Sequence, residues 1–152
     1  MKAGDFVKRV LLALVAVLAA YVVLYYAIEH RRAAKGPWQV TFAQLQGRSP
    51  AILINQSGLG ITNVQISFPV SSNAVAKDSV TICFGEAQRT PFDLPLGKCV
   101  FLDTVFLPGT VAIEISGHQI QLLPRVLTID GVERAWVSGE NIFLTDKPTK
   151  KE

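Results

Sequence analysis

The sequence predicts an all-β globular domain, an antiparallel β-sandwich or a small barrel of about nine or ten short strands, preceded by one N-terminal transmembrane α-helix. Two observations predict this architecture. An apolar run near the N-terminus is long enough to cross a bilayer. From Trp38 onward, apolar and polar residues alternate between turn dipeptides, as they do in half-buried strands.

Composition divides the chain into five segments. We expect a short cytoplasmic flank at residues 1–9, the transmembrane helix at 10–28, a basic juxtamembrane tether at 29–37, an extracytoplasmic β-domain at 38–145 and a disordered charged tail at 146–152. The part beyond the tether is long enough to bury a core of its own.

The apolar run, Val10–Ile28, has nineteen residues without charge, proline or glycine. As a helix rising about 1.5 Å per residue it spans roughly 28 Å, close to the hydrocarbon core of a bilayer. A cleaved signal peptide has a shorter apolar region before its cleavage site, and a soluble core helix has a polar face. We therefore interpret the run as an uncleaved span, ended by Gly36-Pro37, with Tyr25, Tyr26 and Trp38 at the membrane interface.

The basic charge lies around this helix rather than on the globular part. Residues 1–35 carry six basic and two acidic side chains, a net of +4, whereas residues 36–152 carry nine basic and ten acidic ones, a net of −1. A nucleic-acid interface needs a basic stripe on the folded domain, so we expect no nucleic-acid partner. The basic flanks are suited to lipid headgroups, which makes the bilayer the expected partner.

Orientation depends on weaker signals, because basic residues flank the helix in nearly equal number on both sides. The short N-terminus and a pair of cysteines, which suit an oxidising compartment, favour a cytoplasmic N-terminus. The expected location is a single-pass membrane protein whose C-terminal domain is extracytoplasmic, either periplasmic or extracellular.

The clearest strand unit is a hairpin around Ser116-Gly117. A two-residue loop there pairs Ile113 with Ile120 and Val111 with Leu122 on one face, which leaves polar residues on the other. Such a pattern is typical of a half-buried antiparallel hairpin.

Two further turns have recognisable chemistry. Asp130-Gly131 predicts a type I′ hairpin turn, because both central residues of that turn need positive φ. Leu107-Pro108-Gly109-Thr110 predicts a type II turn, with glycine at the position of positive φ.

Cys83 and Cys99 are the only cysteines. In an oxidising compartment they are candidates for a disulfide between neighbouring strands, and the alternative is two reduced, buried thiols. Two cysteines at this spacing without a nearby histidine do not make a metal site, so no metal or other cofactor is expected.

Two sets of residues are candidates for contact with a partner. Phe92, Leu94 and Leu96 lie in a proline-flanked loop at residues 89–98, where they either meet a partner or fold back over the open edge of the core. The small residues Ala13, Ala16 and Ala20 form a helix stripe that suits either a second helix or lipid.

Two polar residues have alternative interpretations. His118 follows a turn, and the absence of any local catalytic signature favours a solvated turn histidine over a catalytic base. Asp103 shares a strand side with Cys99 and Phe101, which makes it either a partly buried carboxylate with a partner or a strand-edge carboxylate facing solvent.

The sequence contains no catalytic signature, so we do not expect an enzyme. The leading hypothesis is a non-catalytic accessory, scaffold or assembly subunit of an envelope membrane complex, because a short tether restricts the domain to partners at the membrane. Its expected partner is a membrane protein complex, contacted through the β-domain and the helix. The alternative is a membrane-tethered module that binds a lipid, glycan or peptide.

Overall fold

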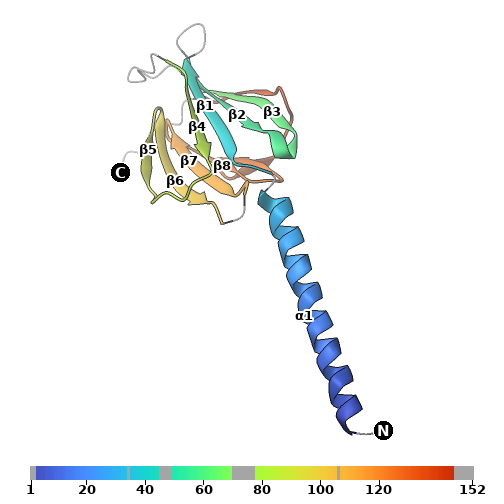
Figure 1. Cartoon of the computed structure of the whole chain (residues 1–152). Helices are drawn as coiled ribbons and strands as arrows, with labels where there is room; N and C mark the ends of the chain where they lie inside the picture. The colour runs from blue at the N-terminus through green and yellow to red at the C-terminus, as the bar shows by residue number, and fades with distance from the viewer. Residues whose placement is uncertain (1–2, 34, 45–48, 70–77, 106, 146–152) are drawn as a thin grey trace. The chain divides into compact units, whose positions relative to one another are not determined.

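The computed structural model describes residues 3–33, 35–44, 49–69, 78–105 and 107–145 of the chain. It forms two compact units, residues 1–34 and 35–152, which contain one long helix and a two-sheet β-domain (Figure 1). The predicted disordered tail at residues 146–152 lies outside the described residues.

Helix α1 extends over Ala3–Ala33, beyond both ends of the predicted span. Hydropathy marks the lipid-compatible stretch, whereas flanking residues such as Lys8, Arg9 and Glu29 are good helix formers and continue the backbone helix. Its large apolar side chains are exposed within its own unit. The helix is long and apolar enough to cross a membrane, a property that it shares with signal sequences.

The domain has two sheets, so it is sandwich-like rather than a closed barrel. Sheet A has the order β11-β3-β2-β1-β4, with β1 Trp38–Gln44, β2 Pro50–Gln56, β3 Ile61–Ser67, β4 Val80–Phe84 and β11 Asn141–Phe143. Sheet B has the order β10-β9-β8-β7-β6-β5, with β5 Phe92–Leu94, β6 Gly97–Asp103, β7 Thr110–Ile115, β8 His118–Leu122, β9 Leu127–Ile129 and β10 Val132–Arg134.

The core lies between the sheets and is built by the alternation that the sequence displays. In β8, for example, Ile120 and Leu122 are buried, whereas Gln119 is exposed and Gln121 is half-buried. The largest fully buried side chains come from both sheets and include Trp38, Phe42, Phe68, Phe84, Ile52 and Ile113. Trp38 is therefore a core residue and not the interfacial residue that we predicted.

The predicted hairpins are confirmed. Strands β7 and β8 pair Ile113 with Ile120 and Val111 with Leu122, as the Ser116-Gly117 loop requires. Asp130 and Gly131 both have positive φ, 51° and 81°, and connect β9 to β10.

Two short strands were not predicted. Strand β5 forms within the supposed loop at residues 89–98 and pairs with β6. Strand β11 pairs with β3 in parallel, so the domain is not wholly antiparallel. Each has three residues, which is too short for an alternating pattern to be recognised in a sequence.

A β-bulge interrupts β6 between Cys99 and Phe101, because Cys99 pairs with Ile113 while Phe101 pairs with the adjacent Ala112. The extra residue shifts the alternation by one position. Cys99 is therefore fully buried and Phe101 is 52% exposed, although an uninterrupted strand would place both on one side.

The start of the domain is fixed against the 3-10 turn η1, Ser57–Leu59. The buried side chain of Gln56 donates to the carbonyl oxygens of Gly36 (2.8 Å) and Pro37 (3.0 Å) and accepts from the N–H of Gly58 (2.8 Å). A side chain at Gly58 would collide with the backbone of Lys35. The last part of the predicted tether is thus an ordered part of the β-domain.

Candidate functional site

An apolar groove of about 450 Å³ opens on one side of the sandwich, where β4 is the edge strand of sheet A and β5, next to β6, is the edge strand of sheet B. Figure 1 shows β4 and β5 at the same side of the domain. The groove is lined by Pro37, Ile82, Cys83, Phe84, Gly85, Glu86, Gln88, Phe92, Leu102 and Leu107.

The groove walls are side chains that pack only partly against the core. Ile82 of β4 and Phe92 and Leu102 of sheet B are half-buried, which leaves part of their apolar surface facing the groove. The rings of Phe84 and Phe92 lie 6.5 Å apart and join the two sheets at its base. Leu102 occupies this position because the β6 bulge resets the strand's alternation.

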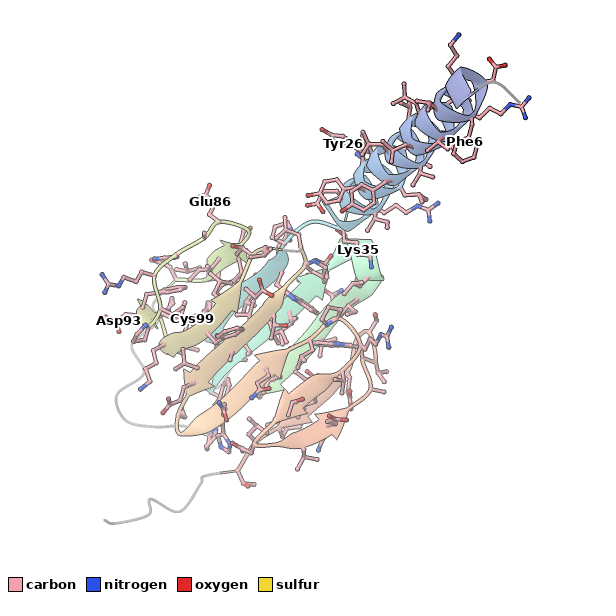
Figure 2. The ribbon with its side chains drawn as sticks, turned by 90° about the horizontal axis from the view of Figure 1, so that it is seen from below. Phe6, Tyr26, Lys35, Glu86, Asp93 and Cys99 are labelled. Atoms are coloured by element: carbon pink, nitrogen blue, oxygen red, sulfur yellow. The ribbon has the colours of Figure 1, made fainter. Side chains whose placement is uncertain are left out.

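Charge lies at the rim of the groove rather than inside it. Among the lining residues that the structure describes, Glu86 is the one that carries a charge, and Figure 2 shows it on the loop after β4, pointing away from the domain. Asp93 of β5 is also exposed at the outer side. The groove therefore suits an apolar occupant, because an unpaired charge buried there would lose its hydration.

The loop residues predicted to contact a partner lie mainly in the core. Leu94 is buried, and Phe92 and Leu96 pack against the core cluster. Their positions agree with the alternative interpretation, in which these side chains fold back over the edge of the core. Of the three, only Phe92 lines the groove.

The predicted disulfide is not formed. Cys83 lies on β4 of sheet A and is exposed, whereas Cys99 lies on β6 of sheet B and is buried, and both are free thiols. The Cys99 thiol donates to the carbonyl oxygen of Phe101 at 3.4 Å, and burial raises its pKa above 9.0. The fifteen residues between the two cysteines in the sequence did not reveal that their strands, β4 and β6, belong to different sheets.

His118 is buried, so its interpretation as a solvated turn residue is wrong. Its Nδ1 lies 2.6 Å from a carboxylate oxygen of Asp130, and its Nε2 lies 3.0 Å from the carbonyl oxygen of Thr145. Asp130 also accepts from the backbone N–H of Gln119 at 3.0 Å. The ring of Phe68 packs nearby, with centroids 6.4 Å apart.

This arrangement gives His118 a structural role. Both ring nitrogens face oxygen atoms of the chain, one in a carboxylate and one in a backbone carbonyl. A histidine that acts as a base needs one nitrogen directed at the group it deprotonates. Here the second nitrogen is bound to the chain's own backbone.

The remaining candidates are placed as follows. Asp103 is half-buried at the end of β6 and accepts from the N–H of Val105 at 3.0 Å, which is a local turn contact.

Ala13, Ala16 and Ala20 are exposed on α1, and their contact with another helix or with lipid stays a prediction. Over residues 3–33, 35–44, 49–69, 78–105 and 107–145, no three His, Cys, Asp or Glu side chains gather as a metal site would need.

A second hollow of about 350 Å³ lies at the opposite edge of sheet A, beside β3 and β11. Its lining is more mixed and includes Ser49, Gln65, Ser67, Asn141 and Phe143. Phe143 is 75% exposed there. It is a single exposed aromatic at the end of a three-residue strand, so we consider the groove beside β4 the better candidate.

Comparison with protein-family models, with curated proteins and with solved structures finds no match to this chain. The geometry of the domain and the apolar character of the helix are therefore the observations that bear on function.

Proposed function

We propose that this protein is a single-pass membrane protein with an extracytoplasmic β-domain, and that it serves as a non-catalytic accessory, scaffold or assembly subunit of an envelope membrane complex. The observation that carries the proposal is the apolar groove beside β4, a concave and nearly uncharged surface on an otherwise well-packed domain. Apolar surface left open in this way is typical of a site for another molecule.

The helix supports the membrane part of the proposal. Its apolar side chains have no cover within their own unit, and a bilayer is the solvent that would remove them from water. Gln56 binds the backbone of Gly36, which is only three residues after Ala33, the last residue of α1. The tether between the helix and the domain is therefore short. A domain on so short a tether meets partners at the membrane surface, where their effective concentration is high.

The polar groups support a non-catalytic role. The one buried histidine is bound to Asp130 and to the backbone of Thr145, and the groove lining carries a single carboxylate at its rim. Acid–base catalysis needs titratable groups that converge on a reacting atom. The groove instead offers shape and apolar surface.

The full-length chain, purified from its native membrane in mild detergent, tests this proposal. Cys83→Arg places a bulky charge at the exposed groove wall, and Val132→Arg makes the same change on exposed β10 of the other sheet. We expect a stoichiometric protein partner with the wild-type chain and with Val132→Arg, and its loss with Cys83→Arg. A wild-type chain that purifies alone would contradict the proposal.

The groove volume also favours a second candidate, a ligand-binding module. About 450 Å³ lies within the range of small-molecule sites, roughly 300–1,000 Å³. Native mass spectrometry of the same preparations separates the two functions. A small molecule that is bound by the wild-type chain and lost in Cys83→Arg, without a protein partner, would establish the second.

A further inference from the structure

We propose that β4 accepts a β-strand from a partner chain, an extended and uncharged segment that pairs with the open edge of sheet A and places every second side chain in the groove. This inference rests on the proposed function and names the partner's chemistry. The observations that support it are the four sheet edges, the backbone of β4 and the position of the groove.

Among the four edge strands of the described sheets, β4 alone is without the features that protect an edge. Strand β5 has three residues, includes Asp93 and is flanked by Pro91 and Pro95. Strand β10 has three residues and carries Glu133 and Arg134, and β11 is also only three residues long. Short length, charge and proline are the usual means by which proteins prevent edge pairing. Strand β4 has five residues and neither charge nor proline.

The outer side of β4 offers main-chain hydrogen bonds. The strand pairs with β1 on one side and stands last in the order of sheet A. Within the part of the chain that the structure describes, no other backbone group bonds to residues 80–84. A strand exposes donors and acceptors on its free side, and another strand satisfies them in a way that lipid or glycan does not.

The groove continues inward from this edge. Ile82 and Phe84 of β4 point toward the core, and the groove begins beside them. A strand that pairs with β4 would place alternate side chains next to Ile82, against Phe92 and Leu102 of sheet B. Its other side chains would lie beside Thr81, which faces outward and bonds to Thr41 at 2.8 Å.

The chain that donates the added strand is a different protein. It is not a second copy of this chain pairing through its own β4. In a second copy, Ile82 and Phe84 are already packed in that copy's own domain and cannot enter the groove. The donor is uncharged because the edge has no charged residue and the described groove lining has one carboxylate, at the rim. A charge buried between the sheets would remain unpaired.

The test uses a photoreactive benzoylphenylalanine at Thr81 of the full-length chain, irradiated in native membranes. Because Thr81 is on the outer face and does not line the groove, an added strand would meet the probe, whereas a molecule held only in the groove would not. We expect adducts with a short uncharged segment of another protein, identified by mass spectrometry. The same probe at Val132 of β10 is the control. Adducts with lipid or with a second copy, or no adduct above this control, would overturn the inference.

Paired variants separate this inference from the proposed function. Val80→Lys adds charge to the β4 edge, where Val80 is 42% exposed, and Val132→Lys adds it to β10, where Val132 is 61% exposed. We expect Val80→Lys to lower the yield of the Thr81 adduct about tenfold and Val132→Lys to leave it unchanged. A partner that leaves with Cys83→Arg but stays fully bound with Val80→Lys would refute strand addition and leave the proposed function intact. The absence of any partner from the wild-type chain would refute both.

Discussion

His118 makes hydrogen bonds that join the two sheets. It begins β8 of sheet B, and its ring binds Asp130 in the β9–β10 turn and the carbonyl oxygen of Thr145, which follows β11 of sheet A. Strand β11 itself pairs with β3 over three residues only. The histidine therefore connects the end of the described chain, through Thr145, to the β9–β10 turn, through Asp130.

Replacing His118 by phenylalanine should measure these bonds. The substitution keeps an aromatic ring but removes the side-chain hydrogen bonds to Asp130 and Thr145, so we expect the free energy of unfolding to fall by about 2 kcal/mol. Urea unfolding of the full-length chain in detergent is followed by the fluorescence of Trp38 and Trp136, the only tryptophans. The exposed neighbour Gln119→Ala should change stability by less than about 0.5 kcal/mol. Equal stabilities for both variants would contradict the role assigned to His118.

Cys99 predicts a pH dependence. Burial raises the pKa of its thiol above 9.0, so the folded chain keeps the proton at a pH where the unfolded chain releases it. Its contribution to stability is complete below about pH 9 and is lost as the pH rises through the folded-state pKa. Wild-type stability should fall more steeply above pH 9 than that of Cys99→Ala, in the same urea experiment.

At the scale of elements, the ordered start of the domain is the feature that the sequence did not indicate. Gln56 is the last residue of β2, and nothing in the neighbouring sequence predicts that its amide binds the backbone 19 and 20 residues earlier. Gly58 is needed because a side chain there would meet Lys35.

Trypsin should report on this contact, because Lys35 is a cleavage site at the start of the domain. Gly58→Ala displaces the Lys35 backbone, and Gln56→Ala removes the hydrogen bonds that hold the next two residues. We expect either change to speed cleavage after Lys35 about fivefold, through easier local opening. Ser57→Ala, at an exposed position between them, is the matched control. Fragment masses distinguish this cut from cuts at Arg31 and Arg32, and an unchanged rate in both variants would contradict the assigned contact.

Local chemistry explains which elements were predicted correctly. The Ser116-Gly117 and Asp130-Gly131 hairpins were predicted because turn type and alternation specify their register over a few residues. The β6 bulge, the parallel β3–β11 pair and the groove were not predicted. Each depends on which strands become neighbours, a property of tertiary packing that a single sequence does not display.

At the scale of the whole molecule, the free thiols alter the argument for orientation. The predicted disulfide was one reason to place the domain outside the cytoplasm, and the structure does not contain it. The extracytoplasmic location of the domain therefore stays a prediction. The exposed thiol of Cys83 now offers a direct test, because it needs no reductant to react.

A membrane-impermeant maleimide, added to intact cells without reductant, should label Cys83 if the β-domain is extracytoplasmic. Cys99 should react only after denaturation, since it is fully buried and its raised pKa keeps the thiol protonated at neutral pH. Cys83→Ser should abolish the labelling of intact cells, while Cys99→Ala should leave it unchanged. A partner strand on β4 would slow the reaction, and Val80→Lys would then restore its rate. Labelling that appears only after the membrane is permeabilised, in both the wild type and Val80→Lys, would place the domain in the cytoplasm.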